Sequence, residues 1–461
     1  MNTETLILGG GLAGLSAAYH TDREYLLLER EQRVGGLCRT NWYDGFGFDL
    51  SIHILFTKQP DLATLICSEL LDGQYHDHTR SSWVYSHGGY SGYPFQSNLY
   101  GLPADVAANC LLGLIAARAA PPGNPANFAE WARATFGDGI AEHFFLPYNE
   151  RVWATPPEAM DFRWIADRVA VPDLESVVRG MLEPPVTRWG PNSSFWYPIE
   201  GGIEALPRGL VARLDPDRVR VGTTVETIDC TTHTVTTDDG ASVGYDDLIS
   251  SLPLPVLVRM VDDVPEAVRA AAARLRWNTV YTVMIGVRRP EISDHHWVYF
   301  HEDEFVFHRI SYPMNFSPTL APDGCSSIMA EISHSSHRDV SGRDLVQETI
   351  DGLRRAGVLR DDDEIVLGMV APIVPAYVIY SLDHQECVAT ILEWLGRMGI
   401  RTVGRFGEWQ YFNMDQAIGS GRDAARTIAA EHLVDLVGAE ALEAAEADSV
   451  PRGARGVSTR R

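Results

Sequence analysis

The chain has 461 residues, of which 45% are hydrophobic and 22% charged, and its formal net charge at pH 7 is −24. This length and composition predict about two to four domain-sized units with enough apolar residues to build cores. The acidic balance excludes a general nucleic-acid or anionic-membrane binder, because such proteins need a basic surface. Lys58 is the only lysine, which argues against Schiff-base or lysine-base catalysis.

The first segment, TLILGGGLAGLSAAYH, has the pattern of an apolar strand, a glycine turn and a helix of small residues, and YLLLER follows as a second strand. Gly9, Gly11 and Gly14 have the GxGxxG spacing, which permits a tight turn, close approach of a pyrophosphate and close helix packing. Glu29, 20 residues after Gly9, is placed for an adenosine ribose hydroxyl. The pattern predicts dinucleotide binding, and a glycine-rich turn in some other α/β protein is the alternative.

A second glycine pair, Gly35 and Gly36, lies in REQRVGGLCRT directly after Glu29. It resembles the ExxxxxGGxxxT element of the amine-oxidase-like FAD proteins, where that element lies beside the flavin and its phosphates. The same resemblance implies an adenine contact at Val225 and a ribityl or phosphate contact at Asp415, so FAD is the expected cofactor. The predicted cofactor contacts are Gly9, Gly11, Leu12, Ala13, Gly14, Glu29, Arg30, Gly35, Gly36, Leu37, Val225, Arg405, Asn413, Met414 and Asp415.

The order of these segments predicts an α/β protein with a discontinuous, Rossmann-like FAD-binding domain, an inserted helical domain and a second, antiparallel sheet domain. We expect the FAD-binding domain to comprise residues 1–96, 201–275 and 401–440, the helical, nucleotide-binding insert 97–185, the second sheet 186–200 and 276–400, and a flexible tail 441–461.

The sequence shows no clear motif for a metal site, a signal peptide or a membrane span. The six cysteines show no CxxC or zinc spacing, which predicts reduced thiols and no metal site. The start of the chain lacks a basic signal-peptide region, and its most apolar run, residues 365–380, is too short for a membrane span and carries two prolines. We therefore expect a cytoplasmic protein without a membrane or nucleic-acid partner.

Aromatic, amide and arginine residues recur in four further segments: YPFQSN at 93–98, FFLPYNERVW at 144–153, YFHEDEFVFHRISYP at 299–313 and GRFGEWQYFNMD at 404–415. Rings can stack on a base, amides can read its edge, and the guanidinium groups of Arg168, Arg309 and Arg405 match phosphate oxygens. Ordinary packing aromatics and a surface ion pair are the alternatives.

In order and spacing, these segments resemble the UDP-galactopyranose mutase family, particularly its eukaryotic-type branch, over most of the chain. The resemblance implies that the uracil, the diphosphate and the sugar are held by Tyr93, Gln96, Phe144, Tyr148, Asn149, Trp153, Asn192, Tyr299, Tyr377 and Tyr411. It also implies that the groups nearest the chemistry are His53, Arg168, Arg309 and Arg405.

The resemblance implies an isomerase that interconverts the pyranose and furanose forms of a UDP-hexose, UDP-galactose or a related sugar. In that chemistry N5 of reduced FAD attacks the anomeric carbon and forms a flavin–sugar adduct, and NAD(P)H is the expected reductant. The sequence leaves open whether the protein forms a homo-oligomer. The alternatives are an FAD-dependent oxidase or dehydrogenase of the amine-oxidase-like superfamily, and a nucleotide-sugar binder without turnover.

Two departures from the family pattern affect the flavin side. Ser51 and Ile52 stand where the family has two glycines before the histidine, here His53, and a β-branched residue disfavours left-handed backbone. The C-terminal element is also two residues shorter before NMD, the segment that contains Asn413 and Asp415.

Overall fold

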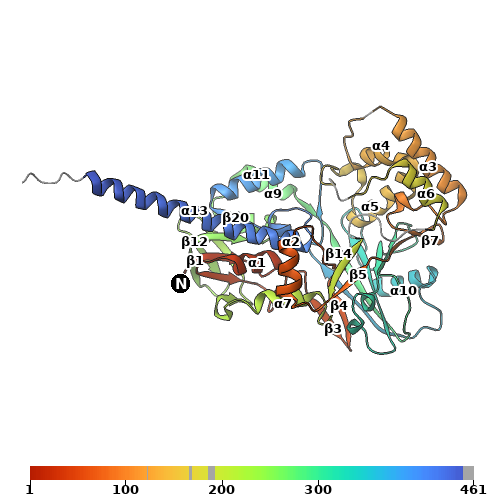
Figure 1. Ribbon diagram of the computed structural model, residues 1–461, viewed down its shortest axis with the longest axis horizontal. Helices are drawn as coiled ribbons and strands as arrows, with labels where there is room; N and C mark the ends of the chain where they lie inside the picture. Colours follow the sequence, from red (N-terminus) through yellow and green to blue (C-terminus); the bar gives the residue numbers. More distant parts are fainter. Residues whose placement is uncertain (122, 166–168, 185–192, 450–461) are drawn as a thin grey trace, which may run out of the picture.

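The computed structural model describes residues 1–121, 123–165, 169–184 and 193–449, with side chains through residue 434. Two seven-stranded sheets form its centre, and helices cover them (Figure 1). The predicted α/β architecture with a helical insert and a second sheet is confirmed.

The first sheet surrounds the N-terminal strand. Its strands, in spatial order, are β10 (Val225–Asp229), β11 (Thr234–Thr237), β12 (Ser242–Ser250), β1 (Asn2–Leu8), β2 (Tyr25–Leu28) and β9 (Val219–Arg220), and β20 (Ile400–Thr402) also pairs with β12. β1 runs parallel to both neighbours, and Leu6, Ile7 and Leu8 are fully or almost fully buried. This continuous apolar run is typical of a parallel strand covered on both faces.

The second sheet lies at the centre of the opposite half of the molecule. Its strands are β18 (Ile365–Ile373), β14 (Thr279–Val287), β17 (Ser326–His334), β16 (Arg309–Ser311), β15 (Trp297–Phe300), β6 (Ser82–Ser86) and β7 (Gly89–Gly92). All neighbouring pairs are antiparallel except β6 with β15. Three small two-stranded sheets pair β3 (Thr40–Tyr43) with β4 (Phe46–Asp49), β5 (Tyr75–Thr79) with β8 (Ser194–Pro198), and β13 (Arg276–Trp277) with β19 (Val378–Ile379).

Side chains alternate across the second sheet, as strands require. Ile310, Ala330 and Val283 pack in the core that also contains residues of α10 (Leu345–Arg355). Met284 and Met329 face the other way, against the β3–β4 hairpin. Residues at odd positions of β16 and β17 therefore point away from α10 and toward the first half of the molecule.

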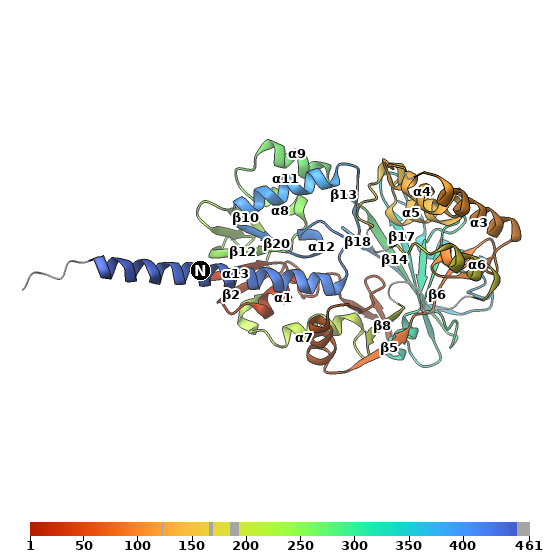
Figure 2. The same ribbon diagram turned by 45° about the horizontal axis from the view of Figure 1, so that its top comes forward.

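Helices α3 (Ala104–Ala119), α4 (Phe128–Ile140), α5 (Leu146–Trp153) and α6 (Leu174–Leu182) form the insert at one end of the molecule (Figure 2). The helices around the first sheet are α1 (Leu12–His20), α7 (Ala205–Val211), α8 (Leu254–Met260), α9 (Glu266–Arg274), α11 (His384–Arg397) and α13 (Met414–Ser449). Two short helices complete the set, α2 (Pro60–Ala63) and α12 (Gly404–Gly407). In both views α13 lies along α1 and then extends beyond the body (Figures 1 and 2). Among the described helices, none is long and apolar enough to cross a membrane.

The observed organisation differs from the predicted boundaries at four points. β8 lies in the range 186–200 predicted for the second sheet, yet it pairs with β5 in a separate two-stranded sheet. β6 and β7 lie in the first range predicted for the FAD-binding domain, yet they pair with the second sheet, because β6 adds to the free edge of β15. Helix α11 lies in the range 276–400 predicted for the second sheet, yet it packs on α9 and β20 beside the first sheet. Helix α13 continues to Ser449, past the tail boundary predicted at 441.

Candidate functional site

The glycine turn between β1 and α1 leaves the end of the helix open. Gly9 has φ +97°, and Gly11 precedes α1 without a side-chain cap. A Cβ on Gly14 would lie 1.9 Å from the Gly9 carbonyl oxygen, whereas one on Gly11 would meet nothing closer than 3.9 Å. The first turn of α1 holds no acidic residue, so its amide dipoles face outward toward any phosphate.

Glu29 lies against this turn. Its Oε2 accepts a hydrogen bond from the Gly10 amide at 2.6 Å, and its Oε1 accepts one from the Glu31 amide at 2.8 Å. Each carboxylate oxygen keeps a second lone pair for a ribose hydroxyl. The neighbouring Arg30 is exposed, and its guanidinium contacts Glu31.

The second glycine pair, Gly35 and Gly36, packs against this turn. The two segments, residues 9–14 and 35–36, together form what we call the glycine cradle. The Gly35 amide donates to the Gly10 carbonyl at 2.8 Å, and a Cβ on Gly36 would lie 3.1 Å from the Gly11 Cα. These contacts require small residues on both sides. Residues 9–14, which include Leu12 and Ala13, and residues 35–36 therefore form one continuous surface, and Leu37 follows directly in the chain.

The C-terminal segment closes the cradle from another side. A Cβ on Gly404 would lie 2.6 Å from the Ala13 Cβ, so α12 packs tightly on α1. Asp415, at the start of α13, is 8% exposed, and its Oδ1 has no hydrogen-bond partner. Burial raises the pKa of Asp415. Met414 is buried and Asn413 half-buried beside it, and Val225 is buried at the start of β10.

Arg405 is the most unusual cation of the site. Its guanidinium carbon lies 4.9 Å from the ring centroid of Tyr377 and 4.7 Å from that of Tyr411, and the two rings are parallel within 4°. Its Nε and Nη2 atoms are buried without a hydrogen-bond partner, and no described carboxylate forms an ion pair with it. A guanidinium with unused buried donors is suited to receive an anion.

Arg309 lies nearby on β16 but has a carboxylate partner. Its Nε and Nη2 donate to Oε2 of Glu331 at 2.9 and 2.5 Å, and Nη2 lies 3.4 Å from the Tyr377 hydroxyl. Tyr148 and Tyr299 also lie close enough to Arg309 to interact with its charge. Burial raises the pKa values of Tyr148 and Tyr377, so both are neutral phenols that can donate hydrogen bonds.

The predicted aromatic residues gather between the insert and the second sheet. The Tyr93 and Tyr299 rings lie 4.6 Å apart, the Phe144 and Tyr148 rings stack at 5.0 Å, and Tyr148 meets Tyr299 edge-on at 5.3 Å. Trp153 contacts Tyr377 and Tyr411 at 5.6 and 6.3 Å. Residues from distant segments thus form one aromatic wall.

The two predicted amide side chains already have internal partners. Gln96 is 3% exposed and donates to the Ala170 carbonyl at 2.7 Å. Asn149 donates to the Phe145 carbonyl and accepts from the Trp153 indole at 3.1 Å. Part of the hydrogen-bonding capacity predicted for a base is therefore used inside the protein.

The segment before His53 keeps ordinary backbone geometry. Neither Ser51 nor Ile52 has a positive φ, so the segment does not use the left-handed conformations that glycines would permit. His53 has a buried Nδ1 without a partner, and burial lowers the pKa of His53 to about 4, which leaves the imidazole neutral. His53 also lines a small cavity together with Asp49 and Tyr197.

Sequence reasoning missed Glu331 and Asp49. Glu331 is 2% exposed on β17, and Asp49 accepts hydrogen bonds from Thr40, Tyr197 and the Ile203 amide. Burial raises the pKa of Asp49 to about 6. A usable signal existed for Glu331, because a single acidic residue interrupts the strand-like run SSIMAEISH.

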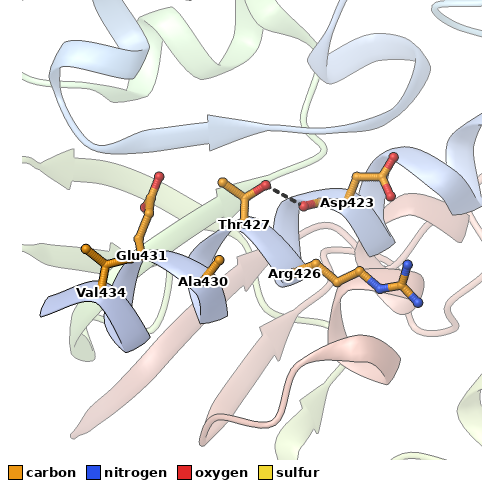
Figure 3. A pocket seen from close by; sticks show the side chains of 6 residues that line it. All are labelled: Asp423, Arg426, Thr427, Ala430, Glu431 and Val434. Atoms are coloured by element: carbon orange, nitrogen blue, oxygen red, sulfur yellow. Dashed lines mark hydrogen bonds between the residues drawn. The ribbon is translucent and has the colours of Figure 1, made fainter. Parts of the chain in front are cut away.

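Two predicted residues, Arg168 and Asn192, lie outside the described residues. A separate shallow pocket on the surface of α13 contains no residue of the predicted site (Figure 3). It is lined by Asp423, Arg426, Thr427, Ala430, Glu431 and Val434. Within the described ranges, no group of three or more His, Cys, Asp or Glu side chains is arranged to hold a metal ion.

Solved structures and known sequences resemble this chain at different levels. Reduced UDP-galactopyranose mutase superposes with a TM-score of 0.87 at 29% identity, covering 94% of this chain and 96% of that chain. A putative protoporphyrinogen oxidase from Exiguobacterium sp. 255-15 superposes with a TM-score of 0.72 at 18% identity, covering 93% and 99% of the two chains. The latter likeness shows the fold alone.

Among sequences, the coproporphyrinogen III oxidase of Mycobacterium leprae is 27% identical over 319 residues, which are 61% of this chain and 67% of that protein. The enzyme of the same name from Mycobacterium bovis is 26% identical over 294 residues, 58% of this chain and 63% of that protein. The chain thus spans less than two thirds of the length of the M. bovis relative. The family model for flavin containing amine oxidoreductases matches residues 12–429, and the chain therefore belongs to this family.

Proposed function

We propose that the protein is a flavin-dependent isomerase that interconverts the pyranose and furanose forms of a UDP-hexose, UDP-galactose or a related sugar. The observation that carries the proposal is the half-buried Arg405 over two tyrosine rings, whose Nε and Nη2 atoms are buried without a partner, next to Arg309 and an aromatic wall. In a chain of net charge −24, this local positive site favours an anionic, ring-bearing ligand. The likeness to reduced UDP-galactopyranose mutase supports the same class of ligand.

Membership of the family implies FAD, and the residues present fit it. The open end of α1 and the glycine surface of residues 9–14 and 35–36 would hold the pyrophosphate, and Glu29 would hold the adenosine ribose. The unpartnered Oδ1 of Asp415 would accept from a flavin hydroxyl. When bound and reduced by NAD(P)H, the flavin would supply the nucleophile for the anomeric carbon of the sugar.

The side chains would then handle the leaving group. Arg309 and Arg405, with Arg168, would stabilise the charge that develops on the diphosphate as it departs and returns. The hydroxyls of Tyr299, Tyr377 and Tyr411 would complete its hydrogen bonds. Tyr93, Phe144, Tyr148, Asn149, Gln96 and Trp153 would hold the uridine, and Asn192 and the neutral His53 would lie beside the sugar and flavin.

A second function has a specific observation in its favour. The M. leprae and M. bovis sequence relatives are named coproporphyrinogen III oxidase, and an oxidase could use the same flavin cradle. Its substrate would carry carboxylates that two arginines could also bind. The two functions demand opposite states of the flavin, which makes them separable.

The test is anaerobic turnover of UDP-galactose by the purified holoprotein, with the ring size of the product read by NMR. We expect conversion only after reduction of the flavin, with far less reductant consumed than product formed. Turnover by the oxidised protein, with hydrogen peroxide released and no change of ring size, would establish the oxidase instead. Binding of UDP without conversion in either state would identify a binder that lacks turnover.

A further inference from the structure

Glu331 occupies a position where a carboxylate is costly. It lies in the middle of β17, opposite Arg309 on β16 and Thr282 on β14, and is 2% exposed. A buried carboxylate must be paired and hydrogen-bonded to persist. Its partners therefore indicate what it does.

The two oxygens of Glu331 serve different parts of the site. Oε2 accepts from Nε and Nη2 of Arg309 at 2.9 and 2.5 Å, and Oε1 accepts from the backbone amide of Ile52 at 3.1 Å. Burial alone would raise the pKa of Glu331, but the charge of Arg309 and the contacts from His308 and Ile52 lower it to about 2. Glu331 is therefore an ionised acceptor on both sides.

These contacts join the anion-binding residues to the segment that carries His53. Nη2 of Arg309 lies 3.4 Å from the hydroxyl of Tyr377, and the Tyr377 ring lies under Arg405. On the other side, the Ile52 amide immediately precedes His53. A bound anion competes with Glu331 for the positive charge of Arg309 and so weakens the bond between Arg309 and Glu331. The hydrogen bond from the Ile52 amide to Glu331 then becomes stronger.

We propose that Glu331 is a positioning residue that couples anion binding at Arg309 to the backbone of Ser51–His53; this rests on the proposed function, which makes Arg309 a diphosphate ligand. Only a carboxylate can do this, because both of its oxygens accept. A glutamine would turn its oxygen toward the cationic Arg309 and its NH2 group toward the Ile52 amide, where two donors would meet. Glu331→Gln should therefore keep Arg309 in place and disconnect Ile52.

The chain contains a matched control in Asp363. This carboxylate also binds an arginine, Arg289, and a backbone amide, that of Arg360 at 2.8 Å. Its side chain is 5% exposed, and it lies at none of the predicted site positions. Asp363→Asn makes the same chemical change in a comparable environment.

The experiment measures hydrogen exchange of peptides that contain Ile52 in the holoprotein, with and without inorganic pyrophosphate. Glu331→Gln should speed exchange at Ile52 about tenfold, which is the effect of one lost hydrogen bond. Pyrophosphate should slow exchange at Ile52 in the wild type and in Asp363→Asn, but leave it unchanged in Glu331→Gln.

The proposal is overturned if pyrophosphate leaves Ile52 exchange unchanged in the wild type, or slows it equally in Glu331→Gln. A UDP titration of the flavin absorbance gives a second readout that a merely structural role would not move. The difference spectrum should persist in Asp363→Asn and vanish in Glu331→Gln at saturating UDP. If pyrophosphate acts as expected but UDP-galactose is not converted, the coupling stands and the proposed function fails.

Discussion

Replacement of Arg405 by methionine should have opposite effects on stability and on ligand binding. In the protein without FAD or nucleotide, Nε and Nη2 of Arg405 lack hydrogen-bond partners, at a cost of about 1–3 kcal/mol each. Contacts with the Tyr377 and Tyr411 rings offset about 0.5–1 kcal/mol each. Methionine keeps the apolar contacts without the unused donors, so we expect Arg405→Met to raise the free energy of unfolding by about 1 kcal/mol or more.

The same change should weaken nucleotide binding. Loss of one charged hydrogen bond costs about 1.5–3 kcal/mol, which is at least about tenfold in Kd. At a UDP concentration of about 100 times the wild-type Kd, ligand stabilisation should fall from about 2.7 kcal/mol to about 1.4 kcal/mol.

The assay is thermal unfolding with and without UDP, of the FAD-free protein for the stability effect and of the holoprotein with matched FAD content for the UDP effect. Arg289→Met is the control, and its expected effect on stability is opposite, because it leaves the buried carboxylate of Asp363 without its cation. It should destabilise the protein and leave the UDP effect unchanged. If Arg405→Met is less stable without nucleotide and gains as much from UDP as the wild type, then Arg405 is a structural residue and the reasoning is refuted.

Three further outcomes can be measured with standard assays. Gly11→Val should give a folded protein that purifies without FAD, because a Cβ there would meet no protein atom closer than 3.9 Å. Gly14→Ala should fail to fold, because its Cβ would lie 1.9 Å from a carbonyl oxygen; circular dichroism and released flavin report both. Arg309→Ala should weaken UDP binding at least about tenfold by calorimetry, and unchanged affinity would contradict its role. Because the folded pKa of Glu331 is about 2, below its ordinary value, its contribution to stability is present above about pH 4.5 and is lost as pH falls toward 2. Denaturant titrations should therefore show a shallower loss in that range for Glu331→Gln, and parallel curves would count against an ionised Glu331.

The local patterns of the sequence were enough to predict the sheet around β1 and the glycine cradle. Gly14 is constrained by the carbonyl of Gly9, five residues away, and Gly9 by its own positive φ of +97°, and such local constraints leave a readable spacing. The β6–β15 pairing was not predictable, because residues 82–86 and 297–300 are far apart in sequence and either could have ended a sheet. Long-range strand pairing depends on the whole fold rather than on local pattern.

The functional site also contains features that the sequence could predict and features that only the structure shows. Arg309 and Arg405 could be named from the order of the motifs, but only the structure distinguishes the paired guanidinium from the unpartnered one. Gln96 could be placed near the aromatic wall, yet its bond to the Ala170 carbonyl depends on a residue 74 positions further along the chain. Glu331 was overlooked because an acidic residue in a strand is usually taken for a solvent-facing position.

The assembly of the cradle from distant segments sets the order in which the protein can mature. Residues 9–14 and 35–36 emerge first from the ribosome, but Gly404 and Gly421 pack against Ala13 and close the cradle only when the C-terminal segment has been made. Contacts between such distant segments form slowly and late. FAD capture is therefore a late event that follows synthesis of α13, and chains that stop before Met414 should accumulate without flavin, exposed to proteolysis.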